Sequence, residues 1–214
     1  MNPEEYARMH QFEDWYWWFV ARREAALQFV RDFRPGDGPV RILDAGCGTG
    51  ALLECLARER GTNVYGADLA VEALAFSRGR GRRGLVQADL IALPFRADTF
   101  DIVTALDVVE HVEADTAALA EIRRVLKPGG ILVMSVPAYA FLWSSHDEAL
   151  HHKRRYTAGM LAPRLKDAGL VTTRMTYLLS VLFPAIALFR LADRLRPQTG
   201  PAHAHLVPVP AALN

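Results

Sequence analysis

The stretch RILDAGCGTG at residues 41–50 constrains this chain most, because a short apolar run leads directly into a glycine-rich loop. The run at 40–45 reads as a buried strand, and residues 51–59 after the loop read as a helix. A strand, a glycine loop and a helix in this order open many α/β sheets, whose ligands bind at the carboxyl ends of the strands. The loop is therefore the first candidate for a binding site.

Four further apolar runs repeat this alternation. They read as strands: NVYGAD (63–68), LVQAD (85–89), FDIVTALD (100–107) and ILVMSVP (131–137). Helices are predicted between them at 71–77 and from Asp115, which we expect to cap its helix. The pattern predicts an α/β fold with a doubly wound, mostly parallel sheet and helices on both faces. A last helix at 157–170 and a sixth strand, VTTRMTYL (171–178), complete the expected elements.

Composition narrows the classes of partner. Lysine and arginine total 25 against 24 acidic residues, so the net charge of +1 gives no general reason to expect nucleic acid. The one basic run, RGRGRR (78–83), reads as a solvated loop. Two cysteines cannot build a disulfide framework, and the polar amino terminus does not resemble a signal peptide. With no apolar run of about 18–20 residues, we expect a cytoplasmic protein.

The glycine loop alone does not identify its ligand. A phosphate-binding P-loop would need Gly-Lys-Ser/Thr where the chain has Gly50-Ala51-Leu52. A dinucleotide fingerprint fits better, because Gly46-x-Gly48-x-x-Ala51 matches its permissive form and Asp68 follows about 20 residues later. An NAD-dependent oxidoreductase is therefore one alternative.

Four carboxylates decide between the ligands. Asp44, Asp68, Asp89 and Asp107 each stand at the end of a predicted strand, so they line up along one edge of the sheet. Together they would repel a pyrophosphate by several kcal/mol in a partly buried cleft. They suit a ligand with an amino group, two ribose hydroxyls, an adenine amine and a sulfonium, which describes S-adenosylmethionine.

LDAGCGTG, GADLAVEAL, QADLIALPFRADTFDIV, DVVEHV and VLKPGGILVMSVP together resemble the class I S-adenosylmethionine-dependent methyltransferases, over roughly residues 40–137. The resemblance implies that the methionine end and sugar are held by Asp44, Gly46, Cys47 and Gly48. It implies that Asp68 and Leu69 bind the ribose and that Asp89 and Leu90 bind the adenine. Asp107 would flank the methyl donor, and the product would be S-adenosylhomocysteine. Simpler alternatives are that Asp68 caps the next helix and Asp89 a turn.

The amino-terminal region is unusually aromatic. DWYWWFVARRE (14–24) follows a predicted helix start at Asn2, with a break expected near the aromatic cluster. One face of the helix, including Trp18 and Arg22, could simply pack on the core. In this fold the first helix often lies across the cofactor. We therefore expect residues 1–34 to form a helical lid that shields the sulfonium from water, with Trp18 among the cofactor-binding residues and Arg22 or Arg23 at the cofactor carboxylate.

WSSHDEALHHKRRYT (143–157) lies where this fold usually builds its acceptor pocket. We expect residues 138–157 to be an acceptor-loop insertion, with Arg154 and Arg155 meeting an anionic acceptor or acids of the lid. Its histidines match no zinc spacing, so no metal is expected. His111 is the first candidate base and His146 the second, although His111 could also be structural. The aromatic start and this segment resemble a bacterial subgroup whose acceptors are mostly unassigned.

The expected division is a lid at 1–34, a cofactor-binding core at 35–178, and an apolar helix with a Pro-rich tail at 179–214. A departure from the family is that no seventh strand is evident, so the chain is truncated or a partner, such as a second copy, covers the sheet edge. The apolar run would pack on the core, with an apolar acceptor site or a membrane surface as lesser alternatives. The prediction is methyl transfer to oxygen, nitrogen or carbon of a small molecule, apolar or anionic. A non-catalytic cofactor-binding protein is the second alternative.

Overall fold

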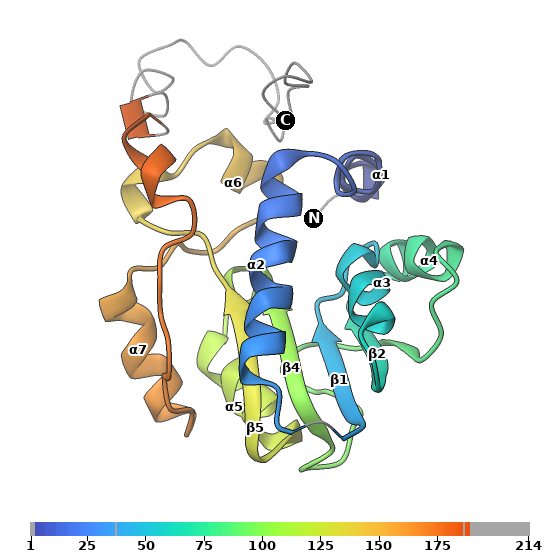
Figure 1. Ribbon diagram of the computed structural model, residues 1–214. Helices are drawn as coiled ribbons and strands as arrows, with labels where there is room; N and C mark the ends of the chain where they lie inside the picture. The colour runs from blue at the N-terminus through green and yellow to red at the C-terminus, as the bar shows by residue number, and fades with distance from the viewer. Residues whose placement is uncertain (1–2, 37, 186, 189–214) are drawn as a thin grey trace.

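The computed structural model describes residues 3–36, 38–185 and 187–188. Its centre is a sheet of five parallel strands in the order β3-β2-β1-β4-β5, flanked by helices (Figure 1). The strands are β1 (Val40–Ala45), β2 (Thr62–Asp68), β3 (Leu85–Gln87), β4 (Phe100–Leu106) and β5 (Leu126–Ser135). The order reverses direction on either side of β1, as expected for a doubly wound sheet.

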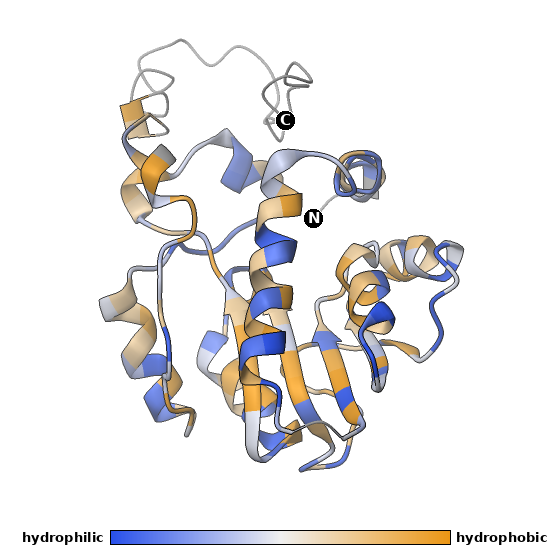
Figure 2. Cartoon of the chain, viewed as in Figure 1, coloured by the Kyte–Doolittle hydropathy of each residue, from blue (hydrophilic) through white to orange (hydrophobic). Residues whose placement is uncertain are grey.

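Two apolar layers sandwich the sheet, because successive side chains of a strand point to opposite faces. Ile42 of β1 packs with the layer that contains Leu27, whereas its neighbour Leu43 packs with the layer that contains Leu119. The first layer is covered by α2 (Trp17–Phe33) and α3 (Ala51–Arg58), and the second by α5 (Asp115–Val125) and α7 (Ala158–Asp167). The central strands are accordingly largely orange in Figure 2, interrupted by blue bands where charged residues stand.

The amino-terminal region forms two helices, α1 (Pro3–Phe12) and α2, which confirms the expected break beside the aromatic cluster. α1 lies against α4 (Val71–Gly79), above the carboxyl ends of the strands, while α2 runs down the face of the sheet (Figure 1). The remaining helical elements are the single turns η1 (Val109–His111), η2 (Ala140–Leu142) and η3 (Ser180–Leu182) and the short α6 (Ser145–Ala149).

The predicted sixth strand at 171–178 is wrong. Every residue of this segment is exposed, and β5 pairs with β4 alone among the described strands. A strand needs a neighbour to bond its backbone groups, and here side-chain contacts hold the segment instead. Arg174 lies 5.2 Å from the centre of the Phe29 ring, and Tyr177 stacks on Tyr139 at 5.2 Å.

The predictions for the carboxyl terminus lie mostly outside the described residues, which end at residue 188. This applies to the Pro-rich tail and to most of the predicted apolar helix. In the described part of the chain, none of the helices is both long and apolar enough to cross a bilayer.

Candidate active site

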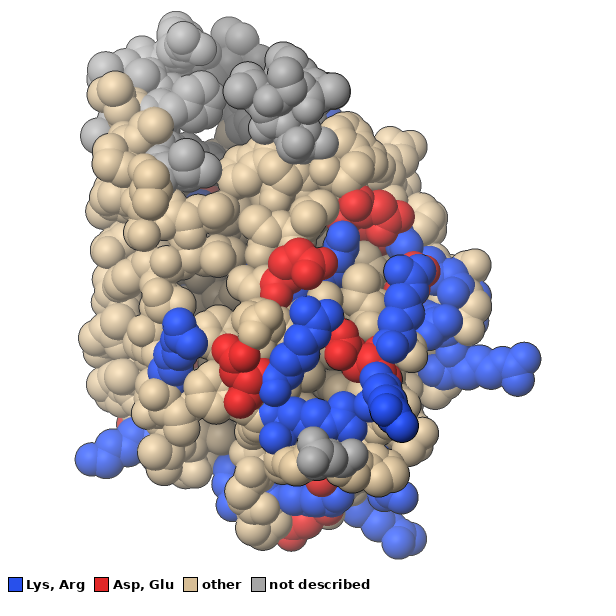
Figure 3. Space-filling view, viewed as in Figure 1, with Lys and Arg blue, Asp and Glu red and all other residues tan. Residues whose placement is uncertain are grey.

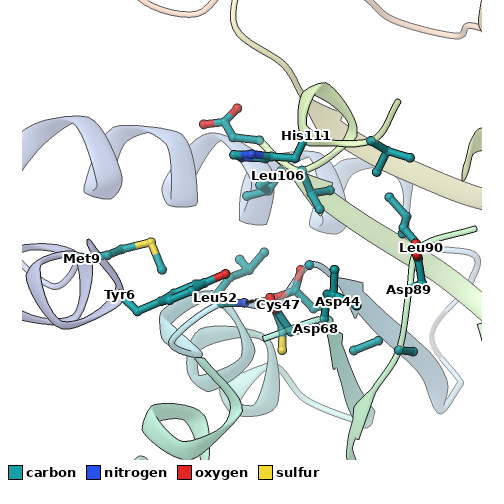
Figure 4. A pocket seen from close by; sticks show the side chains of 18 of the residues that line it. Tyr6, Met9, Asp44, Cys47, Leu52, Asp68, Asp89, Leu90, Leu106 and His111 are labelled. Carbon is teal, nitrogen blue, oxygen red and sulfur yellow. Dashed lines mark hydrogen bonds between the residues drawn. The ribbon is translucent and has the colours of Figure 1, made fainter. Parts of the chain in front are cut away.

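A cavity of about 490 Å³ opens at the carboxyl ends of β1, β2 and β4, where the order of the sheet reverses (Figure 4). That volume lies within the usual range of small-molecule sites. Its floor carries Asp44, Cys47 and Asp68, with Tyr6 and Met9 of α1 to one side (Figure 4). The cavity therefore occupies the position that the order of the strands predicts for a ligand.

The backbone amides of Gly46, Cys47 and Gly48 in the glycine loop donate hydrogen bonds to other groups of the protein. Gly46 and Cys47 donate to the carbonyl of Ala67, at 2.7 and 3.0 Å, and Gly48 donates to Asp68 Oδ2 at 2.8 Å. Gly46 has φ +79°, and an added Cβ would lie 2.7 Å from Cβ of Val108, so only glycine fits. Because these three amides are already used, they are not available to cradle a pyrophosphate, which disfavours the dinucleotide alternative.

Asp44 is a buried carboxylate in the cavity floor. It lies opposite Thr104 in the β1–β4 pair, and the Thr104 hydroxyl donates to Asp44 Oδ1 at 2.7 Å. Burial raises the pKa of Asp44 to about 7, although the Thr104 hydrogen bond lowers it and nearby Asp68 raises it further. A cationic ligand would offset that burial cost, so this position favours a positively charged group.

Asp68 is held by two backbone amides. Its Oδ2 accepts from Gly48 and its Oδ1 from Ala70 at 2.9 Å, which fixes the carboxylate plane beside the cavity. Burial raises the pKa of Asp68, and these two hydrogen bonds oppose the shift. Each oxygen retains a lone pair for a hydroxyl group. The helix cap of α4 is Ala70, so Asp68 is not the capping residue itself.

Asp89 and Leu90 form the far wall of the cavity (Figure 4). Asp89 Oδ1 accepts from the amide of Ile91 at 3.1 Å, so it also stabilises the turn, as the alternative in the sequence analysis suggested. Leu90 is 7% exposed and supplies an apolar surface beside that carboxylate. A flat apolar ring with an amino group would match this pair.

Asp107, at the end of β4, is fully occupied by protein partners. Arg22 of α2 forms an ion pair with Oδ2, and the Ser135 hydroxyl donates to Oδ1 at 2.7 Å. Burial would raise the pKa of Asp107, but the Arg22 guanidinium and Ser135 hold it below the ordinary value. Arg22 therefore neutralises Asp107 at the rim of the cavity. The sequence had instead predicted that Arg22 would bind the carboxylate of the cofactor.

The predicted lid at 1–34 did not specify which residues of α1, or of the turn that follows it, line the cavity. Tyr6, Met9 and Glu13 line the cavity, and their spacing of three and four residues places them on one helical face, which was the available signal. Glu13 is buried and binds the Thr49 hydroxyl and Arg80. Burial, with Asp68 second, raises the pKa of Tyr6 to about 12, so its hydroxyl stays protonated.

Arg80 joins this amino-terminal region to the core, and its prediction as part of a solvated loop is wrong. Its side chain is 10% exposed and lies 2.9 Å from each of three carboxylates, those of Glu13, Asp14 and Glu54. These carboxylates take the place of the water molecules that would hydrate the guanidinium of Arg80 in a solvent-exposed loop. The contacts hold residues 13–14 onto α3.

His111 faces the cavity from η1 (Figure 4). Burial, with His152 second, lowers the pKa of His111 to about 4, so its imidazole is neutral. Its ring lies 4.7 Å from that of His152, whose Nδ1 is 2.9 Å from Asp147 Oδ1. His146 does not line the cavity, and its ring lies 6.4 Å from that of His152. Of the two histidines predicted as candidate bases, the structure therefore places His111 at the cavity.

Residues 138–157 close on themselves beside the cavity. Ala138 and Tyr156 form an isolated bridge, and Tyr139 and Tyr156 donate amides across the base of the segment at 2.9 Å each. Arg155 binds Asp147 through two nitrogens, at 2.7 and 2.9 Å, within the same segment. Arg154 binds Glu113 and Asp115. Both arginines thus have local acidic partners, and the predicted contact with acids of the lid is wrong.

Asp115 is the first residue of α5 and not its cap, which is Ala114. Its carboxylate accepts from the Tyr156 hydroxyl at 2.9 Å and from Arg164 at 3.0 Å, so it supports the acceptor segment.

Trp18 is the other predicted site residue that is absent from the described cavity wall; Phe19, Arg22 and Arg23 represent α2 there. The structure brings the remaining predicted residues together around one cavity. They are Asp44, Gly46, Cys47, Gly48, Asp68, Leu69, Asp89, Leu90, Asp107, Arg22 and His111.

Comparison with known proteins points in the same direction. Residues 43–134 match the family model of a methyltransferase domain. A malonyl-[acyl-carrier protein] O-methyltransferase of Enterobacter lignolyticus is 31% identical over 87% of this chain and 74% of its own length. A ubiquinone biosynthesis O-methyltransferase of Idiomarina loihiensis is 37% identical over 51% of this chain and 47% of its own, so the match spans about half of that relative.

Among solved structures, a complex of the Trm112 methyltransferase activator and a putative methyltransferase from Haloferax volcanii aligns with a TM-score of 0.67 and 25% identity. The alignment covers 83% of this chain and 78% of the other. The sheet order, the cavity at its reversal point and the similarity along most of a named relative agree. The chain belongs to the class I S-adenosylmethionine-dependent methyltransferases.

Proposed function

We propose that this protein transfers the methyl group of S-adenosylmethionine to a small-molecule acceptor. The observation that carries the proposal is the cavity floor, where Asp44 and Asp68 face a space whose nearby loop amides are already bonded internally. A cationic, hydroxyl-rich ligand satisfies these carboxylates, whereas a pyrophosphate would be repelled. Oxygen is the favoured acceptor atom, because the two curated relatives described above are both O-methyltransferases.

In the proposed complex, the ammonium group lies near Asp44 and the ribose hydroxyls bind Asp68. The adenine lies between Leu69 and Leu90, with its amine at Asp89. Gly46, Cys47 and Gly48 form the surface beneath the sugar, and Asp107 with Arg22 closes the side near the methyl group. Tyr6 and Met9 of α1 cover the cofactor, so the lid role passes from Trp18 to α1.

The reaction is an in-line displacement. A lone pair of the acceptor forms a bond to the methyl carbon as the carbon–sulfur bond breaks, and the sulfur keeps that electron pair in S-adenosylhomocysteine. The sulfonium is already a good leaving group, so the protein mainly supplies proximity and orientation. His111 is the cavity residue that faces the acceptor hydroxyl; His146 would act only indirectly.

The charges around the cavity and on the surface of the protein indicate which kinds of acceptor and partner it suits. Because Arg154 and Arg155 are bound to acids, an uncharged, partly apolar acceptor fits better than a strongly anionic one. Basic and acidic side chains are interspersed on the face in Figure 3, which does not favour nucleic acid. Two cysteines without a bridge suit a cytoplasmic location. A second copy could pair with β5, which has β4 as its one neighbour among the described strands, and light scattering on the full chain would reveal such a dimer.

Calorimetric titration tests the cofactor directly. We expect micromolar binding of S-adenosylhomocysteine and none of NAD. Asp68→Ala should abolish the binding, and Asp167→Ala, an exposed residue at the end of α7, should not change it. Binding of NAD alone, or equal affinity in the Asp68 variant, would refute the proposed site. Methyl transfer from the bound cofactor to any acceptor would exclude a purely non-catalytic binding protein.

A further inference from the structure

A buried carboxylate beside the cavity has no hydrogen-bond partner. Glu110, in η1, is fully buried, and both of its carboxylate oxygens lack a partner within the described structure. Leaving such a group unpaired is costly, so native proteins usually provide hydrogen bonds or an ion. The feature therefore needs a physical explanation that the methyl-transfer reaction does not supply.

Two imidazoles face the same point. One ligand atom from each of Glu110, His111 and His152 can be chosen so that all three atoms lie within 4.8 Å of one another. His152 Nε2 is 3.9 Å from Glu110 Oε1. Three donors around a tetrahedral zinc ion, with bonds of about 2.0–2.1 Å, stand about 3.4 Å apart. The His152–Glu110 pair is about 0.5 Å wider than that spacing, and the widest separation that the group allows, 4.8 Å, is about 1.4 Å wider, so the side chains would draw together around an ion.

The surroundings prepare His152 as a ligand. Its Nδ1 is 2.9 Å from Asp147 Oδ1, which favours the tautomer whose Nε2 lone pair points to Glu110. Asp147 is itself fixed by the guanidinium of Arg155. A carboxylate behind a histidine orients metal-binding imidazoles in many proteins. The sequence did not reveal the group, because His152 reaches Glu110 only when residues 138–157 close.

The local charges also leave a place for a cation. Three carboxylates meet here, those of Asp107, Glu110 and Asp147, while Arg22 is bound to Asp107 and Arg155 to Asp147. Glu110 is the carboxylate without a cationic partner at bonding distance. An ion at Glu110 would neutralise this carboxylate, and His111, which lines the cavity, would place the ion beside the cavity wall.

We propose that Glu110, His111 and His152 bind a divalent transition-metal ion of the zinc class, with a further coordination position open to the cavity. Two imidazoles and one carboxylate suit this class better than magnesium or calcium, which prefer oxygen ligands. The proposal departs from the sequence-based expectation of no metal, which rested on spacing along the chain alone.

The role of the ion rests on the proposed methyl transfer. An acceptor hydroxyl that binds at the open position gives its proton to solvent water and keeps the electron pair that attacks the methyl carbon. The electron pair of the broken carbon–sulfur bond stays on the sulfur. His111 then acts on the acceptor through the ion, as a ligand and not as the base.

The test is a titration of the full-length protein, freed of metal by a chelator, with Zn²⁺ in competition with a chromophoric chelator. We expect one equivalent to bind, with affinity at least 30-fold weaker in Glu110→Gln and in His152→Ala. His151→Asn is the matched control, because this neighbouring histidine is exposed and its φ of +58° suits asparagine. Unchanged affinity in Glu110→Gln, or less than one equivalent in the wild type, would overturn the proposal.

Two further readouts separate metal binding from misfolding. Co²⁺ should give visible absorption bands with wild type and not with Glu110→Gln. Without metal, Glu110→Gln should melt at or above the wild-type temperature, and only the wild type should gain stability from Zn²⁺.

S-adenosylhomocysteine is titrated into the same samples. If it binds and Zn²⁺ does not, the ion proposal alone is wrong. If Zn²⁺ binds and S-adenosylhomocysteine does not, the ion site stands, while the proposed function and the role that rests on it are wrong.

Discussion

Replacing Asp44 by asparagine separates the stability of the empty protein from its affinity for the cofactor. The Asp44 carboxyl is 3% exposed, and its pKa of about 7 lies well above its ordinary value of 3.8. That difference of about 3 pH units corresponds to about 4 kcal/mol at 1.36 kcal/mol per unit. Asparagine keeps an oxygen that can accept from Thr104 and carries no charge to bury.

The sign follows from the raised pKa. Above pH 7 the folded protein carries an ionised, buried Asp44, so folding is opposed by up to about 4 kcal/mol. As the pH falls from 7 towards 4, the folded state holds a proton that the unfolded state does not, and this cost disappears. Asp44→Asn should therefore be more stable than the wild type at pH 8, and the advantage should shrink at pH 5.

Urea denaturation of the cofactor-free proteins at pH 8 and pH 5 measures this difference. Comparing each variant with the wild type at the same pH removes the contribution of the other titrating groups. Thr104→Val is the control, because loss of the hydroxyl raises the pKa of Asp44 further and enlarges the cost at pH 8. An Asp44→Asn protein that is less stable than the wild type at pH 8 would refute the reasoning.

Cofactor binding should change in the opposite direction. A charge-assisted contact between Asp44 and the ammonium group would contribute about 1.5–3 kcal/mol, which is about 10- to 100-fold in affinity. Calorimetry with S-adenosylhomocysteine at pH 8 should show that loss in Asp44→Asn. Equal affinity in the two proteins would place the ammonium group elsewhere.

Three other substitutions test separate parts of the site. Gly46→Ala should lower the free energy of unfolding in urea by at least about 2 kcal/mol and weaken S-adenosylhomocysteine binding, because the backbone there has φ +79° and the new Cβ would clash with Val108. Gly38→Ala is the control and should change neither quantity, because nothing lies within 4 Å of a Cβ added there. Arg80→Met should release α1, giving faster hydrogen exchange over residues 3–12 and about tenfold weaker cofactor binding, while the exposed Arg83→Met should match the wild type. Asp147→Asn removes the charge that pairs with buried Arg155 and should cost about 3–5 kcal/mol in urea; a loss under 1 kcal/mol would show that the pair is not needed for folding.

The strands and the glycine loop could be predicted because their information is local. Ile42 and Leu43 belong to a run that is apolar on both faces, as a buried parallel strand must be, and Gly46 follows it directly. The same reasoning failed at 171–178, which has no strand to pair with among residues 3–188 as far as the structure describes them. A hydrophobic pattern therefore predicts a strand only where another strand of the sheet can pair with it.

The missed residues depend on contacts between distant segments. Arg80 looks like one arginine among several in a polar loop, and only the position of α1 surrounds it with acids. Glu110 looks like an ordinary part of the DVVEHV motif until His152 arrives from the acceptor segment. No spacing rule along the chain could connect these pairs, because the closure of each segment creates them.

The edge of the sheet tolerates its carboxylates because the protein treats each one differently. Asp107 is neutralised by Arg22, and Asp68 is held by the amides of Gly48 and Ala70. Asp44 is buried with the Thr104 hydroxyl as its side-chain partner, and its raised pKa lets it remain partly protonated near neutral pH. A ligand with a positive charge beside Asp44 would therefore displace a proton as it binds. This selective neutralisation, and not the number of acids, makes the floor of the cavity specific for a cationic ligand.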